Sequence, residues 1–163
     1  MLPTLFYTTV IFWLVSVLQA ALIPFWLGDF VFLAIFIWTL YFARFRERMR
    51  LPIWNFWVPL IIGLGLTGFL FYSYWVLAPY LLSIILFSAI LTQRSKWVFR
   101  WKEGSAALTL VFVIFVLTVL FIRREVMQYA LTSDFGARFL ITFILGTGVW
   151  VYFVSAAKRG KIR

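Results

Sequence analysis

The chain has no cysteine and no histidine. Without cysteine it has no disulfide bond, no thiolate nucleophile and no cysteine-based metal site, although the redox compartment stays open. Without histidine it lacks the side chain that most often serves as a base at neutral pH and most often binds a metal. These two absences remove many of the usual catalytic and metal-binding chemistries.

Acidic side chains are also scarce. The chain has five of them against fifteen lysines and arginines, which gives a net charge of +10. All five lie at the ends of apolar runs or between them: Asp29, Glu47, Glu103, Glu125 and Asp134. We expect no pair of acids inside a membrane that could share a proton or bind a metal, and the serines have no base to activate them. The sequence therefore predicts a protein that is not an enzyme and holds no metal or cofactor.

Apolar and aromatic residues are present in excess, at 65% and 22% of the chain. Ordinary soluble domains are roughly 45–50% apolar. The charges gather in short clusters, and the run from Leu51 to Gln93 carries none. Because about 20 apolar residues cross a bilayer as a helix, this run alone holds two spans. Open strands would leave unpaired backbone edges in lipid, and the runs lack the alternation of a barrel.

We therefore predict an all-α, polytopic integral membrane protein, a compact bundle of six transmembrane helices in a single domain that covers residues 1–163. Pro24, the Gly28-Asp29 pair and the turn around Ser73 mark breaks between spans. The predicted spans are approximately Thr4–Ile23, Trp26–Ala43, Ile53–Phe71, Trp75–Thr92, Ser105–Ile122 and Phe139–Ala157.

Lysine and arginine set the predicted orientation. The second-to-third loop, the fourth-to-fifth loop and the C-terminal tail carry four each, whereas the fifth-to-sixth loop carries the other three. Because basic residues favour the cytoplasmic side, we predict that both termini are cytoplasmic. The first span lacks a basic n-region and a good cleavage site, so we expect it to be retained rather than removed as a signal peptide.

Two basic clusters are interleaved with aromatic residues next to a predicted span. This arrangement is typical of an interface with anionic lipid headgroups and an aromatic belt rather than of a nucleic-acid surface. We therefore expect contact with anionic lipid and no nucleic-acid partner. The residues assigned to lipid contact are Arg44, Arg46, Arg48, Arg50, Arg94, Lys96, Arg100 and Lys102.

The stretch from Ile62 to Phe69 spells G-x-G-x-x-G through Gly63, Gly65 and Gly68. A dinucleotide-binding loop would require a preceding strand and a following acid for the ribose, and neither is available in the middle of a predicted span. In a helix, Gly65 and Gly68 lie near one face, and Gly63 with Thr67 forms a small-xxx-small pair on a neighbouring face. We expect these residues to pack helices within the chain, or else to contact a partner protein.

Gln19 is a polar side chain near the end of the first predicted span. An interhelical hydrogen bond or an interfacial position is the expected role of such a residue. A contact with a ligand or partner is the alternative.

The order of these features resembles the rod shape-determining protein MreD family. The first span ends in L-Q-x-x-L-I-P (Leu18 to Pro24), and G-D-F-V-F-L from Gly28 opens the second; a basic loop and a third span rich in glycine and leucine follow. The similarity covers roughly Thr4 to Leu91 in pattern, and the last third only in hydropathy and length. Where family members often carry an aspartate after the glycine- and leucine-rich segment, this chain has Thr67.

The resemblance implies a non-catalytic scaffold subunit of the bacterial cell-elongation machinery, which builds peptidoglycan and maintains rod shape. It also implies a location in the bacterial plasma (inner) membrane. The implied partners are membrane proteins: an MreC-like bitopic protein, a RodA-like glycan polymerase and its transpeptidase.

One alternative comes from another class, the substrate-binding S component of an energy-coupling factor vitamin transporter. Such a protein needs a polar-lined ligand cavity of a few hundred Å³ near its outer face. The candidate lining residues are Gln19, Asp29, Asp134 and Arg138. An outward cavity ringed by these residues would favour the transporter, and a closed apolar interior would favour the scaffold.

Overall fold

The computed structural model describes residues 2–21, 28–49, 51–71, 74–94, 98–126 and 133–158. Almost all of these residues are helical, and none of them forms a strand. The all-α prediction is therefore confirmed. The elements are α1 (Leu2–Ala21), α2 (Phe30–Met49), α3 (Trp54–Phe71), α4 (Tyr74–Arg94), α5 (Trp101–Phe121), the π-helical η3 (Ile122–Val126) and α6 (Ser133–Lys158).

The six predicted segments correspond in order to the six α-helices of the described ranges, but several ends differ. α2 runs on through the basic cluster to Met49, α5 starts at Trp101 instead of Ser105, and α6 starts at Ser133 instead of Phe139. Charged residues such as arginine and glutamate are good helix formers. The end of an apolar run therefore marks where a helix meets polar surroundings, not where the helix ends.

Within the part of the chain that the structure describes, three helices are long and apolar enough to cross a membrane by length and composition: Trp75–Gln93, Trp101–Glu125 and Ser133–Ala157. The other three contain shorter apolar stretches, at Leu5–Gln19, Phe30–Arg44 and Trp54–Leu66. Large apolar side chains such as Phe6, Leu110 and Tyr152 lie exposed on the outside of the bundle. Long apolar helices with an apolar exterior are the character of a membrane protein.

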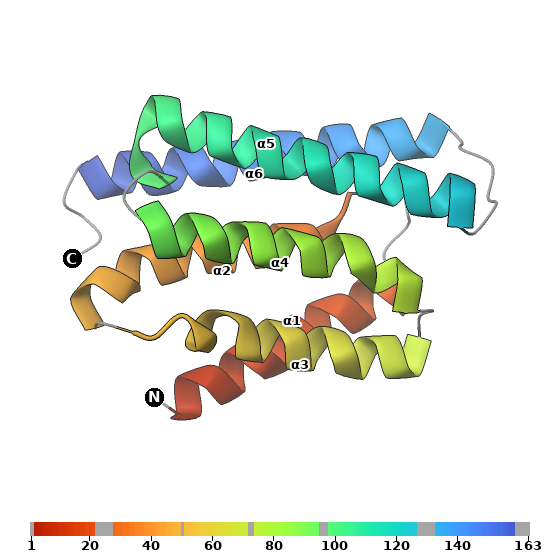
Figure 1. Ribbon diagram of the computed structural model, residues 1–163, viewed down its shortest axis with the longest axis horizontal. Helices are drawn as coiled ribbons and strands as arrows, with labels where there is room; N and C mark the ends of the chain where they lie inside the picture. The colour runs from red at the N-terminus through yellow and green to blue at the C-terminus, as the bar shows by residue number, and fades with distance from the viewer. Residues whose placement is uncertain are drawn as a thin grey trace.

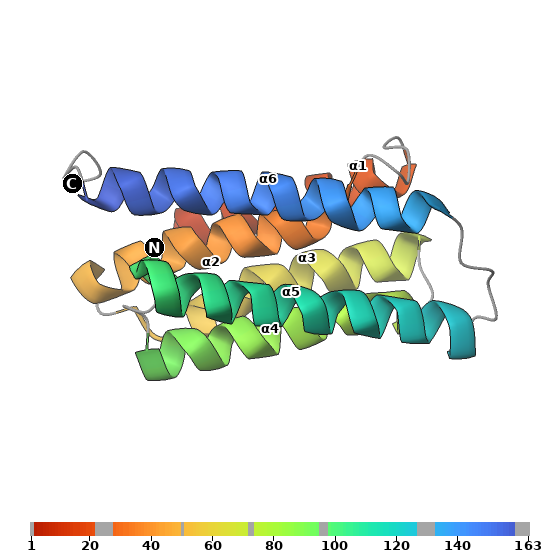
Figure 2. The same cartoon turned by 90° about the horizontal axis from the view of Figure 1, so that it is seen from above.

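The helices form three layers of two, with α1 beside α3, α2 beside α4 and α5 beside α6 (Figures 1 and 2). Successive helices run in opposite directions, so the first turn of α1 and the last turn of α6 lie at the same end, on the left of Figure 1. We call this the basic end, because the last turns of α2 and the first turn of α5 bring Arg46 and Lys102 to it. The opposite end is called the far end.

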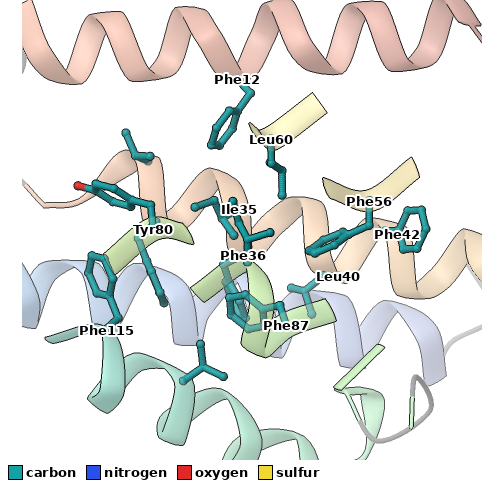
Figure 3. Close-up of a cluster of buried hydrophobic side chains, with 14 of the residues drawn as sticks. Phe12, Ile35, Phe36, Leu40, Phe42, Phe56, Leu60, Tyr80, Phe87 and Phe115 are labelled. Carbon is teal, nitrogen blue, oxygen red and sulfur yellow. The ribbon is translucent and has the colours of Figure 1, made fainter. Parts of the chain in front are cut away.

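α2 lies at the centre of the bundle and packs against α1, α3, α4 and α6. Its apolar side chains point in several directions, as expected for a helix that is hydrophobic all round and buried on most of its faces. Ile35 and Leu40 are fully enclosed, and Figure 3 shows them among aromatic rings from neighbouring helices. The rings of Phe32 and Phe115 lie 4.3 Å apart between centroids. The core is thus built largely from interlocked aromatic side chains.

Candidate functional site

A connected group of buried polar side chains lies at the far end of the bundle. It joins the end of α1, the start of α2, the first half of α4 and the start of α6. Its members, which we call the polar network, are Gln19, Asp29, Tyr80, Arg138 and Thr142, and all five are buried. Polar groups that are withdrawn from water are costly unless they are hydrogen-bonded. The network therefore has to satisfy itself.

The first turn of α2 is capped from two helices. Asp29 is the N-cap residue, and its Oδ1 accepts a hydrogen bond of 2.9 Å from the backbone N–H of Phe32. The Oε1 atom of Gln19, in α1, accepts a bond of 2.8 Å from the N–H of Phe30. The first N–H groups of a helix have no partner inside the helix, and lipid offers none. Asp29 and Gln19 supply those acceptors.

The same carboxylate binds α4 and α6 through its second oxygen. Asp29 Oδ2 accepts a 2.9 Å hydrogen bond from the hydroxyl of Tyr80 and forms an ion pair with the guanidinium of Arg138. The Tyr80 hydroxyl also lies 3.3 Å from Nη2 of Arg138. Both oxygens of the carboxylate are thus engaged, and three helices meet at one side chain.

Gly28 and Asp29, which precede α2, are held against α6. Thr142 Oγ1 accepts a bond of 2.7 Å from the backbone N–H of Asp29 and donates one of 2.7 Å to the carbonyl of Arg138. Gly28 has φ = +120°, which residues with a side chain rarely adopt. A Cβ there would lie 3.4 Å from Ile141 Cγ2 and 3.5 Å from Thr142 Oγ1. Glycine therefore permits both the backbone turn and the close approach to α6.

Gln19 completes the network on the α1 side. Its Nε2 donates a 3.3 Å hydrogen bond to the carbonyl of Gly28, while its Oε1 serves Phe30 as described. The carboxamide therefore bridges two backbone groups on either side of Asp29. This is the interhelical hydrogen bonding expected of Gln19 from the sequence.

The role that these contacts support for the polar network is to hold helices together. A buried ion pair gains little over an apolar pair of the same shape, but removing one partner costs about 3–5 kcal/mol because the other charge is left uncompensated. Such a pair enforces one arrangement of the helices that carry it. The Asp29 carboxylate accepts hydrogen bonds from its own helix, from α4 and from α6, so it fixes these helices relative to one another.

A small pocket of about 30 Å³ adjoins the network between α4, α5 and η3. Its lining includes Tyr80, Arg138 and Arg123, and the Arg123 guanidinium stands 4.7 Å from the centre of the Phe135 ring. The pocket has room for about one water molecule. It is far smaller than the few hundred Å³ that a vitamin would need.

Three of the four residues predicted to line a transporter cavity come together, but their polar atoms bond to other parts of the protein: Asp29 pairs with Arg138, and Gln19 bonds to backbone groups. Gln19, Asp29 and Arg138 belong to the polar network, whereas Asp134 is exposed on the first turn of α6. Arg138 was expected in the fifth-to-sixth loop, and this is a correction: it lies inside α6 and is buried. The physical reason is its pairing with Asp29, which allows a charged residue to lie within the helix just before the apolar run.

Sequence reasoning missed Tyr80 and Thr142, and it placed Gly28 only at a break between spans. Tyr80 and Thr142 lie in apolar helices where single hydroxyl groups are common. The one usable signal was spacing, because Arg138 and Thr142 stand four residues apart and therefore share a helix face. Their partner, Asp29, is distant in sequence, so no local pattern identifies the site.

The glycines of α3 have different surroundings. A Cβ on Gly63 would come within 2.7 Å of Phe12 Cδ1 and 3.4 Å of the backbone N of Trp13, so Gly63 allows α1 and α3 to approach closely. Gly65 is exposed, and a Cβ there would meet nothing within 4 Å. Internal packing, the expected role of Gly65, is therefore not what the fold provides. Thr67 and Gly68 lie in α3, but their side-chain surroundings fall outside the described residues.

The residues predicted to contact anionic lipid lie at or near the basic end where they are described. Arg46 is partly buried, and its guanidinium donates to the carbonyl of Leu91 in the last turn of α4, where a positive charge complements the helix dipole. Lys102 is exposed, and Arg100 pairs with Glu103 at 3.7 Å. Arg44 is half-buried. The side chains of Arg48, Arg50, Arg94 and Lys96 lie outside the described residues.

Among the residues that the structure describes, no group of three or more His, Cys, Asp or Glu side chains is placed to hold a metal ion. Comparison with models of known protein families, with curated proteins and with solved structures finds no match to this chain. The function must therefore be argued from the molecule itself.

Proposed function

We propose that this chain is a six-span membrane protein that acts as a non-catalytic scaffold subunit of the bacterial cell-elongation machinery, as its resemblance to the MreD family implies. The alternating direction of the six helices supports a topology in which all of them cross the membrane (Figures 1 and 2). The three shorter apolar stretches lie within helices of 18 to 20 residues, close to the length that a span needs.

Charge supports the orientation. Arg46 and Lys102 lie at the same end of the bundle as the first turn of α1 and the last turn of α6. Basic residues favour the cytoplasmic face, so in this proposal the basic end is cytoplasmic and the polar network lies near the outer face of the plasma membrane. Both termini are then cytoplasmic.

The observation that carries the scaffold proposal is the use made of the buried polar groups. Asp29, Arg138 and Gln19 are the residues from which a ligand site would be built, and each makes hydrogen bonds or an ion pair with another part of the chain. The interior around Ile35 and Leu40 is apolar and closed. A protein whose buried polar groups hold helices together, and whose outside is apolar, offers surface for binding other membrane proteins.

The outer face of α3 is the part of this surface that the proposal assigns to a partner. Trp57, Ile61 and Gly65 are exposed at helical spacing along it. Because the space beside Gly65 is open, a helix of an MreC-like protein can approach the backbone there. RodA-like and transpeptidase subunits would join through that partner.

The test uses two leucine substitutions two residues apart. Each full-length variant is extracted in mild detergent, and the co-purifying membrane proteins are identified. Gly65→Leu is expected to leave a folded, monodisperse protein that recovers less of the MreC-like partner. Gly63→Leu is expected to lower thermal stability, because the new side chain meets Phe12. Recovery of a transporter ATPase pair, or of no elongation protein by the wild type, would overturn the proposal.

The transporter S component receives less support. Its predicted lining residues Gln19, Asp29 and Arg138 meet, which is the one observation in its favour, but the adjoining pocket is only about 30 Å³. A measured affinity for a vitamin in the purified protein would restore this alternative.

A further inference from the structure

A cleft runs between α5 and α6 on the side of the bundle away from α1 and α3. Its inner part has a volume of about 150 Å³, with Phe32, Phe36 and Phe87 of the middle layer at its floor. Its outer part is an open groove of about 470 Å³ lined by α5 and α6 alone. Thr109, Phe112 and Phe143 border both parts. The two volumes are therefore adjacent.

The packing of the helices keeps this space open. α5 rests mainly on α4, and α6 rests on α2, while α5 and α6 touch each other over only a short stretch. α6 lies close to α2 at Gly146, where a Cβ would be in ordinary contact with Leu33 Cδ2 at 3.6 Å. The middle layer thus sets the distance between α5 and α6, and no large side chain fills the gap along Thr109 and Gly146.

The cleft is too narrow to admit a helix. The rings of Phe112 on α5 and Phe143 on α6 are in contact, with 5.3 Å between their centroids, where the inner and outer parts adjoin. An α-helix with its side chains is about 10–12 Å across, so a helix could not enter without separating α5 from α6. Apart from Thr109, the side chains that line the outer groove are apolar.

The length of the cleft along α5 is close to the hydrocarbon thickness of one lipid leaflet. Together the inner and outer parts extend along α5 from Ser105 to Leu117, which is about 18 Å at the rise of an α-helix. One leaflet contributes about 15 Å of a hydrocarbon core that is about 30 Å thick. The cleft thus starts one turn inside the basic end and reaches past the middle of the bundle.

The mouth of the cleft has the features of a membrane interface. Trp101 and Trp150 pack edge to face there, 5.2 Å apart, and the indole N–H of Trp150 donates to the carbonyl of Val98 at 2.9 Å. Tryptophans collect at the level of lipid headgroups. Lys102 is exposed on the first turn of α5 beside Trp101, and the sequence from Arg94 to Lys102 is basic, with Glu103 following it. A negatively charged headgroup matches this mouth.

We propose that the α5–α6 cleft is a binding site for one anionic phospholipid of the cytoplasmic leaflet, with an acyl chain between Thr109 and Phe143 and the headgroup beside Lys102. This inference requires the membrane location of the chain and the cytoplasmic orientation of the basic end. It does not depend on which proteins the chain assembles with.

The test compares two neighbouring substitutions on α5. Thr109 borders both parts of the cleft, whereas the side chain of Leu110 is 60% exposed on the outside of the bundle. The full-length protein in detergent micelles is titrated with phosphatidylglycerol or phosphatidylcholine, and native mass spectrometry counts the lipids retained. Wild type and Leu110→Trp are expected to retain one phosphatidylglycerol. Thr109→Trp fills the cleft and is expected to weaken that binding by about tenfold or more, since several methylene contacts are lost.

The headgroup is tested separately. Lys102→Gln is expected to reduce the preference for phosphatidylglycerol over phosphatidylcholine by roughly fivefold, in line with about 1 kcal/mol for one basic residue near an anionic lipid surface. If Thr109→Trp fails to fold by circular dichroism, Thr147→Leu, which fills the inner part from α6, replaces it. Equal lipid retention by the filled variant and the wild type would overturn the proposal. So would displacement of a single-span protein, rather than of lipid, by the same substitution.

Discussion

Asp29 and Arg138 form a buried ion pair although 109 positions separate them in the chain. Their side chains are 0% and 8% exposed. The pair fastens the start of α6 to the start of α2 at the far end of the bundle, and Tyr80 adds α4 to the same carboxylate. In the proposed orientation this joint lies near the outer membrane surface, where it would keep the layers in register.

Removal of Arg138 should destabilise the fold strongly. In Arg138→Met the carboxylate of Asp29 stays buried without its cation, and we expect a loss of about 3–5 kcal/mol in the free energy of unfolding. Adding Asp29→Asn should recover part of this loss, since the amide carries no charge but can still cap Phe32. Chemical denaturation in detergent measures both. If the losses of unfolding free energy in the two single variants simply add in the double variant, the pairing is contradicted. Asp134→Asn, which changes an exposed acid, serves as the neutral control.

Gln19→Leu should loosen the start of α2. The substitution removes the acceptor for the N–H of Phe30 and the donor to Gly28, and loss of such a cap costs about 0.5–2 kcal/mol. Hydrogen exchange is expected to accelerate at Phe30 more than at the middle of α2. Gln93→Leu makes the same chemical change at an exposed position in the last turn of α4. Equal effects of the two substitutions would show that Gln19 does not cap α2.

Gly28→Ala should lower the thermal midpoint. The methyl group has to adopt φ near +120° and lies close to Ile141, which costs of order 1–3 kcal/mol for a non-glycine residue in such a region. Gly148→Ala is the matched control, because a Cβ there meets nothing within 4 Å. Alanine is favoured over glycine inside a helix by up to about 1 kcal/mol, so this control should be neutral or stabilising. A stable Gly28→Ala variant would refute the strained turn.

The orientation can be tested with single cysteines, since the native chain has none. Arg124 and Lys102 are both exposed, at opposite ends of α5 and η3. In intact cells an impermeant thiol reagent should label Arg124→Cys and should spare Lys102→Cys until the membrane is opened. Labelling of Lys102→Cys in sealed cells would reverse the proposed orientation. Asp29 is unsuitable for this assay because it is fully buried.

The all-helical fold follows from the sequence alone, because long uncharged runs in lipid have to satisfy their backbone groups within each segment. The charges at Asp29 and in the Arg44, Arg94 and Arg123 clusters, together with the break around Ser73, were enough to predict six helices in order. The role of Gln19 was also predictable, since a carboxamide in an apolar helix seeks a hydrogen-bond partner. Which groups it meets, Phe30 and Gly28, was not.

Only the tertiary structure decided which glycine packs and which polar groups meet. The helices are apolar on nearly every face, so no polar stripe tells whether Gly63 or Gly65 turns inward; the contact with Phe12 on α1 settles it in favour of Gly63. Arg138 looked like a loop residue because a charge ordinarily ends an apolar run. It enters α6 because Asp29, supplied by a distant part of the chain, neutralises it there. Hydropathy reports what each residue prefers, whereas a buried charge depends on a partner that only the folded chain brings within reach.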